Sequence, residues 1–267
     1  MPVPSPTRLA LPAGAMAAVV GLALVAPSLE ARPGCPAEMA NMKVGFCVDR
    51  WEASLEQLDA KGRTAGRHSP FQPVAGQRVR ARSRAGLVPQ AHVSQREAAA
   101  ACAEAGKRLC TDSEWQRACR GPRPTRYPYG DEHRDGRCND RGVSPLLSVF
   151  GPDAPELYGF EKMNDPRLNR VPGSLARTGA FKRCRSAYGV HDMVGNLHEW
   201  TADPAGTFRG GYYLDTVQHG EGCAYVTTGH DTTYRDYSIG FRCCRDVAPA
   251  RPPKAREASP APRRSKG

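Results

Sequence analysis

The sequence predicts a loop-rich domain that is stapled by disulfides and contains only a few short helices and strands. Gly and Pro contribute 27 and 24 of the 267 residues, a share of about 19% that is typical of loops but lies below the low-complexity range. The ten cysteines are an even set, which in an exported chain indicates a disulfide framework. The length allows one large domain with a real core. This composition excludes a coiled coil, a collagen and a polytopic membrane protein.

The N-terminus has the layout of a secretory signal. Arg8 precedes an apolar stretch over 9–26, and a short polar stretch follows it. We expect a signal peptide over 1–31, with cleavage near Ala31. The alternative is a membrane anchor, but Pro12 interrupts the stretch and no basic residue follows it directly. The chain is therefore expected to be secreted or periplasmic, without a stable membrane span.

Two short helices are expected before the middle of the chain. Ser94 and Glu97 form a capping box that leads an alanine-rich stretch, and Gly106 ends it. Thr111 and Glu114 form a second capping box shortly afterwards. Each helix has one apolar face that carries a cysteine. These faces consist of Ala98, Ala101, Cys102 and Ala105 in the first helix, and of Trp115, Ala118 and Cys119 in the second.

Strands are expected to be short and isolated, and the best candidates lie within 45–51, 207–214 and 239–245. The stretch from 121 to 188 has little periodicity and many Pro, Gly, Asn and Asp residues. A structureless stretch of that length needs covalent or ionic support. We therefore expect disulfides, together with bound ions, to hold it.

The C-terminal segment 248–267 is basic and rich in proline. Such a composition buries too little apolar surface to offset its ordering entropy, so we expect a disordered tail. It is either a solvated tail or a weak electrostatic contact to an anionic envelope. The rest of the chain contains no recognisable nucleic-acid-binding module, so no nucleic-acid partner is expected.

Four motifs, in this order, resemble those of the formylglycine-generating enzyme family, the sulfatase-modifying factor domain family. They are GFCVDRWE at 45–52, then GKRLCT at 106–111 with EW at 114–115 and ACRG at 118–121, then YGVHDMVGNLHEW at 188–200, and finally RGG at 209–211 with GFRC at 240–243. The domain is therefore expected over 32–247. The resemblance implies a mixed α+β, loop-rich fold that is similar to C-type lectin-like folds.

The family's chemistry depends on residues that this chain lacks. The resemblance implies oxidation of a substrate cysteine to formylglycine by O2 and a copper(I) ion held by two thiolates, in a Cys-x4-Cys pair after the RGG motif. Asp215 and Gly220 stand at those positions, and a soft metal needs soft sulfur ligands. We therefore expect neither copper nor a catalytic residue of this kind. An iron site remains an alternative, drawn from a loose group of Asp215, His219, His230 and Asp231.

The resemblance also implies a structural calcium ion. Carried over to this chain, its ligands are the side chains of Asp192 and Glu199 and the carbonyls of Gly195 and Leu197. Calcium takes six to eight oxygen ligands, which a tight loop of this kind supplies. A second calcium site would begin at Asn139. The alternative for Glu199 is an ordinary hydrogen-bonding carboxylate.

Two disulfides are implied by the resemblance, Cys102 with Cys243 and Cys119 with Cys223. The other pairings are hypotheses, because spacing does not determine connectivity. They are Cys110 with Cys244, Cys35 with Cys47, and Cys138 with Cys184. With all ten cysteines paired, no free thiol would remain for catalysis.

Two functions follow from these expectations. The first is a calcium-stabilised binding or accessory module for a protein, peptide or glycan, with recognition on the loops 123–185 and 212–236. The second is a divergent oxidoreductase that acts on an exported protein or a small molecule, with a different metal or with Cys223 and a partner thiol. A structural envelope component held by the tail is a third class. Six tyrosines either offer contact area to a ligand or pack in the core, namely Tyr127, Tyr129, Tyr212, Tyr213, Tyr225 and Tyr234.

Overall fold

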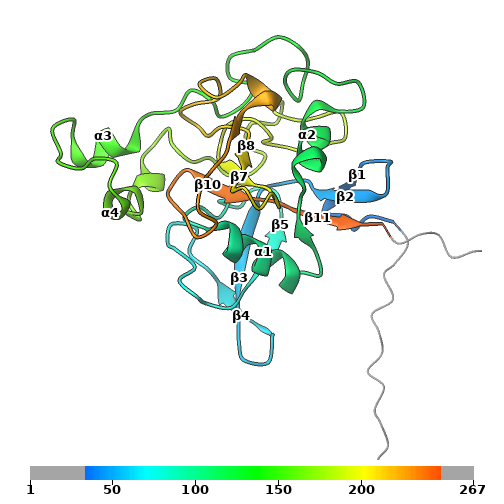
Figure 1. The fold of residues 1–267 in the computed structure, drawn as a ribbon, viewed down its shortest axis with the longest axis horizontal. Coiled ribbons are helices and arrows are strands. Elements are labelled where there is room, and N and C mark those ends of the chain that lie inside the picture. The colour runs from blue at the N-terminus through cyan, green and yellow to red at the C-terminus, as the bar shows by residue number, and fades with distance from the viewer. Residues whose placement is uncertain (1–33, 248–267) are drawn as a thin grey trace, which may run out of the picture. The chain divides into compact units, whose positions relative to one another are not determined.

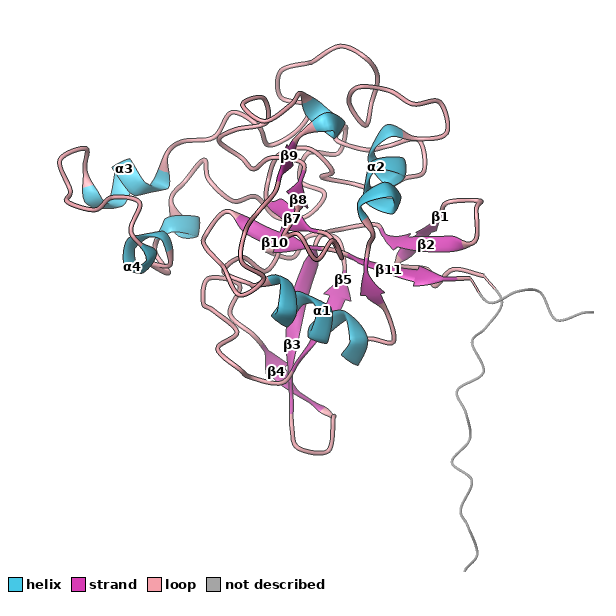
Figure 2. Cartoon of the chain, viewed as in Figure 1, coloured by secondary structure: helices cyan, strands magenta, loops and turns pink. Residues whose placement is uncertain are grey.

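The computed structural model describes residues 34–247 (Figure 1). The expected signal peptide (1–31) and the basic tail (248–267) lie outside these residues. In the described part, three small sheets and several short helices are joined by long loops (Figure 2). This arrangement confirms the predicted loop-rich α+β class. Within residues 34–247, no helix combines the length and the apolar character needed to cross a membrane.

Two four-stranded sheets are built from segments that lie far apart in the sequence. The first is antiparallel and has the order β1 (Met39–Asn41), β2 (Phe46–Asp49), β11 (Cys243–Asp246) and β6 (Arg108–Leu109). The second has the order β10 (Ile239–Phe241), β7 (His198–Trp200), β8 (Phe208–Arg209) and β9 (Val226–Thr227). In this second sheet β10 and β7 are parallel. The C-terminal strands thus lie beside elements from three other parts of the chain.

The third sheet was not predicted. It is antiparallel, with the order β4 (Thr64–Arg67), β3 (Ala53–Leu58) and β5 (Val79–Ser83). Its inward residues include small ones such as Ala53 and Ala81. The hydrophobic periodicity that would indicate these strands is therefore weak in the sequence. The expected strand over 207–214 is also shorter than predicted. Gly210 and Gly211 have left-handed φ angles of 88° and 67° and end β8 there.

The two predicted helices are present with both capping boxes intact. In α1 (Gln95–Glu104), Ser94 accepts from the Glu97 N–H while the Glu97 carboxylate accepts from the Ser94 N–H. In α2 (Asp112–Arg120), Thr111 and Glu114 make the same exchange. Within the long loop region lie the shorter helices α3 (Pro145–Phe150) and α4 (Phe160–Met163), followed by the 3-10 turns Leu168–Arg170 and Gly222–Ala224.

The structure joins the ten cysteines in the same five pairs that the sequence analysis expects. Cys243 and Cys244 are neighbours in β11, and the alternation of a strand sends their side chains to opposite faces. Cys243 packs in the core cluster under α1, whereas Cys244 packs in the cluster beside α2. The strand therefore links the two core clusters, because it carries one disulfide in each of them. The pairs are Cys35–Cys47, Cys102–Cys243, Cys110–Cys244, Cys119–Cys223 and Cys138–Cys184.

Removing the Cys102–Cys243 disulfide should destabilise the domain more than removing Cys35–Cys47. The first bond spans 141 residues and the second spans 12. In the chain-entropy model, the longer loop contributes about 2 kcal/mol more. Urea unfolding of the two Cys→Ser double variants measures the difference. An equal loss of unfolding free energy in both variants would contradict this prediction.

Candidate functional site

The segment 191–200 forms a tight loop that leads into β7. Asp192, Gly195 and Asn196 have left-handed φ angles of 57°, 75° and 63°, which is an uncommon conformation for residues other than glycine. At Gly195, a Cβ atom would lie 2.1 Å from the carbonyl oxygen of Asn139. Only glycine can therefore bring these two backbones together. The result is a loop whose carbonyls and carboxylates are fixed by close packing.

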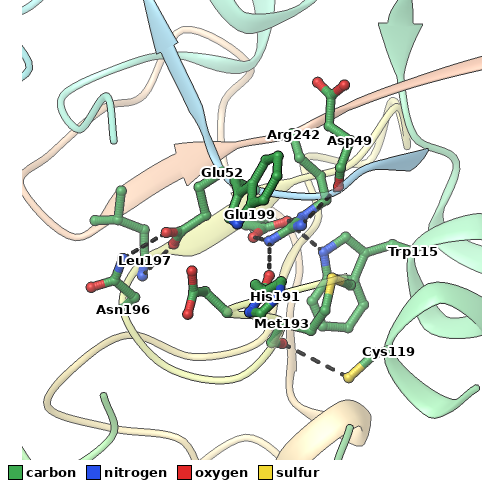
Figure 3. A network of polar contacts seen from close by, with 12 residues as sticks. Asp49, Glu52, Trp115, Cys119, His191, Met193, Asn196, Leu197, Glu199 and Arg242 are labelled. Atoms are coloured by element: carbon green, nitrogen blue, oxygen red, sulfur yellow. Dashed lines mark hydrogen bonds and ion pairs between the residues drawn. The ribbon is translucent and has the colours of Figure 1, made fainter. Parts of the chain in front are cut away.

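Behind this loop lies a fully buried ion pair between Arg242 and Glu199 (Figure 3). Arg242 Nη2 and Nε donate to the two carboxylate oxygens of Glu199 at 2.5 and 2.6 Å. Trp115 Nε1 of α2 donates to the same carboxylate at 2.8 Å. Arg242 also donates to the carbonyls of Asp49 and His191 at 3.1 and 2.9 Å. The guanidinium thus joins β2, β7 and the loop, and the carboxylate of Glu199 adds α2.

Two further buried carboxylates lie near this ion pair. Glu52 accepts from Asn196 Nδ2 at 2.6 Å and from the Leu197 N–H at 3.2 Å (Figure 3). Burial raises its pKa well above the usual range, and the charges of Asp192 and Glu199 add to that shift. Asp192 accepts from the Gly179 N–H at 2.7 Å, and burial raises its pKa to about 7.

The charge of this cluster is unbalanced. When ionised, the three carboxylates of Glu52, Asp192 and Glu199 face the single guanidinium of Arg242, a formal excess of two negative charges. Burial lowers the pKa of Arg242, but the attraction and hydrogen bonds of Glu199 outweigh it, so the net shift is upward. A divalent cation at this place would balance the charge.

The expected calcium ligands fit the metal in their chemistry. Among the described residues, neither the Gly195 nor the Leu197 carbonyl accepts a hydrogen bond, although both residues are buried. Asp192 has one carboxylate oxygen engaged by Gly179, which leaves the other one for a ligand. Glu199 uses three of its roughly four lone pairs on Arg242 and Trp115. Hard oxygen donors on a tight loop are the ligands that calcium prefers.

Within residues 34–247, no three side chains of His, Cys, Asp or Glu come together in a way that could hold a metal ion. A cation at the 191–200 loop would therefore depend on the two carbonyls. The loose group considered for iron is therefore not a metal-binding cluster in the described part of the chain. His230 packs against Phe208 with ring centroids 4.4 Å apart, and Asp231 accepts hydrogen bonds from Thr233 in a turn.

Asn139, where a second calcium site was expected to begin, makes hydrogen bonds to two other segments of the chain. Asn139 Nδ2 donates to the Ser174 carbonyl at 3.0 Å and to Asn196 Oδ1 at 2.9 Å. The Asn139 carbonyl accepts from the Asn196 N–H at 2.8 Å. Next to it, Asp140 Oδ2 contacts His133 Nε2 at 2.8 Å. Asn139 thus makes two hydrogen bonds to Asn196 of the 191–200 loop, and a third bond ties it to Ser174.

The residues at the family's copper positions do not fit a copper site. Asp215 accepts from the N–H groups of Val217 and Gln218 and from the hydroxyl of Tyr225, at 2.9, 3.0 and 2.8 Å. At Gly220 the φ angle is +106°, and a Cβ atom would lie 2.8 Å from the Ala224 carbonyl oxygen. The carboxylate is a structural part of the loop, and the glycine position has no room for a side chain.

All ten cysteines lie within the described residues, and none of them is free. Cys223 is bonded to Cys119, so it carries no thiol for exchange with a partner. Beside Asp215 the space is filled by rings. His198 packs against Tyr212 and Tyr225 at centroid distances of 4.9 and 5.4 Å, and burial lowers its pKa to about 3.

The six tyrosines considered as ligand contacts divide evenly. Three of them pack in the core, and three are half-buried. The core residues are Tyr127, Tyr213 and Tyr225, and the half-buried ones are Tyr129, Tyr212 and Tyr234.

Three residues of this site were not predicted from the sequence, namely Glu52, Trp115 and Arg242. All three belong to the quoted motifs, in GFCVDRWE, EW and GFRC respectively. For Glu52 and Arg242 the available signal was a charged residue inside a short motif with apolar members, because a charge at such a position must be paired when it is buried. The partner could not be read from the sequence, since Glu199 and Arg242 are 43 residues apart.

Replacing Arg242 with Met should lower the unfolding free energy by about 3–5 kcal/mol, because it leaves buried carboxylates without their cation. The double variant Arg242→Met/Glu199→Gln removes one of these charges and should recover part of the loss. Chemical denaturation measures both effects, with the exposed Arg183→Met as the control. A double variant that is no more stable than Arg242→Met alone would contradict the assigned role.

The chain is similar in sequence to a known protein family and to several of its members. The model of the sulfatase-modifying factor enzyme 1-like domain matches residues 3–247. The mouse protein named inactive C-alpha-formylglycine-generating enzyme 2 is 33% identical over 168 residues, which cover 58% of this chain and 48% of that protein. The formylglycine-generating enzyme of Streptomyces coelicolor is 29% identical over 189 residues, with coverages of 60% and 53%. The chain spans about half the length of these curated relatives.

The crystal structure of CarF shares the fold. It superposes with a TM-score of 0.50 and 18% sequence identity, over 76% of this chain and 87% of that one. The family match covers all four motifs, the loop at 191–200 and the strands that carry Glu199 and Arg242. The chain therefore belongs to the sulfatase-modifying factor family, the family of the formylglycine-generating enzymes.

Proposed function

We propose that this chain is an exported, calcium-stabilised binding or accessory module that has lost formylglycine chemistry. The main support for this proposal comes from the surroundings of Asp215 and Gly220. These are the two positions at which the family chemistry requires thiolates. Asp215 is engaged in three hydrogen bonds, and Gly220 has no room for a side chain. The similarity to a mouse protein named as inactive supports the same conclusion.

Export is part of this proposal. Five disulfides in a domain of this size are typical of oxidising compartments and rare in a reducing cytosol. The apolar N-terminal stretch supports the same placement. The ligand is a protein, a peptide or a glycan, held on a scaffold that the disulfides and buried ion pairs keep rigid.

The purified chain should contain no free thiol and should not convert a cysteine-containing substrate peptide to formylglycine. The assay supplies O2 and copper(I), reads the peptide mass, and uses the Streptomyces coelicolor enzyme as the positive control. The variant Asp215→Cys/Gly220→Cys should also stay inactive, because the Ala224 carbonyl blocks a side chain at 220. Conversion by the unmodified chain above the enzyme-free background would overturn the proposal.

The alternative is a divergent oxidoreductase of the family. It is favoured by the 29% identity to the Streptomyces coelicolor formylglycine-generating enzyme. It requires a redox metal bound in stoichiometric amount or free thiols, and neither is expected under the main proposal. Elemental analysis and thiol titration under denaturing conditions distinguish the two functions, and oxygen consumption would then be the next assay.

The calcium ion would be held by Asp192, by the carbonyls of Gly195 and Leu197, and by the remaining lone pair of Glu199. Its contribution is structural, because it offsets the negative charge of the buried carboxylates. A ligand that binds only the folded state stabilises it by about 2.7 kcal/mol at a concentration 100 times its Kd.

Adding calcium to EDTA-treated protein should therefore raise its Tm by about 5–10 °C. Asp192→Ala should remove most of that rise. Asp192→Asn should keep part of it, because the amide retains a ligating oxygen and asparagine tolerates the left-handed backbone there. Asp153→Ala, at an exposed carboxylate, is the matched control. An equal response of the Asp192→Ala and Asp153→Ala variants would show that the ion does not bind at this loop.

A further inference from the structure

The sheet β4–β3–β5 carries a row of arginines that none of the functions above uses. In β5, Val79, Ala81 and Ser83 are buried, whereas Arg80 and Arg82 lie on the opposite face. The inward residues pack in the core cluster that includes α1, which crosses this sheet (Figure 1). Successive side chains on one face of a strand are about 6.8 Å apart. Arg84 follows at the next alternate position, so the row extends beyond the end of the strand.

This row borders a groove of about 830 Å³, a volume within the usual range of ligand sites. We call it the arginine groove. It has six basic lining residues, namely Arg67, Arg80, Arg82, Arg84, Lys107 and Arg177. Apolar atoms also line it, from Leu55, Leu87 and Val88 among others. Three acidic residues, Glu38, Glu56 and Glu104, line it as well, so the basic residues are in excess. The groove thus combines a net positive charge with an apolar lining.

Half of these basic groups are already held by partners within the protein, two of them by carboxylates and one by backbone carbonyls. Lys107 contacts Asp49 at 2.6 Å, and Arg82 contacts Glu56 at 2.9 Å. Arg80 donates to the carbonyls of Gly62 and Glu104. These three side chains are therefore already occupied.

The other three guanidiniums carry uncompensated charge. Arg67, Arg84 and Arg177 are exposed. In the described part of the chain, no carboxylate lies within 4.0 Å of any of them. Arg177 also donates to the Gly86 carbonyl at 3.0 Å, but a carbonyl does not cancel its charge. Three cations without a carboxylate partner that line one groove attract an anionic ligand.

Trp51 adds an aromatic surface to the groove. Its backbone N–H and carbonyl are both bonded to the Ser83 hydroxyl, at 3.1 and 3.0 Å. Its ring stacks on His191, with the centroids 6.1 Å apart. The half-buried indole is therefore fixed where it lines the groove, and it offers apolar contact to a ligand.

We propose that the arginine groove binds an extended peptide segment in which acidic and apolar side chains alternate. An extended peptide points alternate side chains to opposite sides, so one side can present carboxylates to the exposed guanidiniums of Arg67, Arg84 and Arg177. Its other side would present apolar side chains to Leu87, Val88 and Trp51, which are half-buried. A polysulfated glycan is hydrophilic on all sides and would leave this apolar lining without a partner. The proposal deepens the binding role proposed above and rests on it.

Fluorescence anisotropy with a labelled peptide of alternating Glu and Val tests this proposal on the full chain. The double variant Arg84→Ser/Arg177→Ser removes two free guanidiniums and should weaken binding by about tenfold. The matched control is Arg123→Ser/Arg183→Ser, which removes the same charge at two exposed arginines outside the groove and should change the Kd less than about twofold. The same peptide with Lys in place of Glu should not bind.

Three results would overturn the proposal: no binding by the unmodified chain, an equal loss in both double variants, or tighter binding of a heparin oligosaccharide than of the peptide. The formylglycine assay on the same preparations keeps the two proposals apart. Conversion of the substrate peptide would overturn the non-catalytic role, whatever the groove binds. If the chain neither converts the substrate peptide nor binds the Glu–Val peptide, only the proposal about the groove is overturned.

Discussion

The buried pair of Arg242 and Glu199 is the contact on which the arrangement of this domain depends. A planar guanidinium with five donors can satisfy a carboxylate and two backbone carbonyls at once. Here it does so between strands that come from opposite ends of the domain. The sheets are small and the loops long, so polar contacts between segments that are distant in the sequence have a large part in fixing the fold. The pair therefore specifies how the strands assemble, while the disulfides keep them assembled.

The elements that were predicted correctly are those whose cause is local in the sequence. Both helices begin at a capping box, which lies within four consecutive residues, and each box forms as expected. The third sheet was missed because its strands are short and several of their inward side chains are small, so the alternation in β5 covers only five residues. The charge network was missed because its members are brought together only by tertiary folding. The resemblance supplied Asp192 and Glu199 but gave no reason to look for Glu52.

The two positions to which the resemblance assigns copper ligands, Asp215 and Gly220, are part of the packing of their loop. Asp215 is bonded to two backbone N–H groups and to Tyr225, and Tyr225 in turn packs on the buried ring of His198. A thiolate there would leave these donors with a poorer acceptor. Asp215 is thus a structural part of its loop. In contrast, the 191–200 loop has oxygens that its hydrogen bonds leave unused, namely one carboxylate oxygen of Asp192 and the carbonyls of Gly195 and Leu197.

The placement of the disulfides fixes when this domain can become stable during its synthesis. Three of the five bonds join cysteines at 102, 110 and 119 to partners at 223, 243 and 244. These three early thiols emerge from the ribosome close together and must wait, reduced, until nearly the whole domain has been made. In an oxidising compartment they can meanwhile form wrong bonds with one another. Production of the native protein then depends on thiol exchange after chain completion, so a host without a disulfide isomerase would accumulate scrambled isomers.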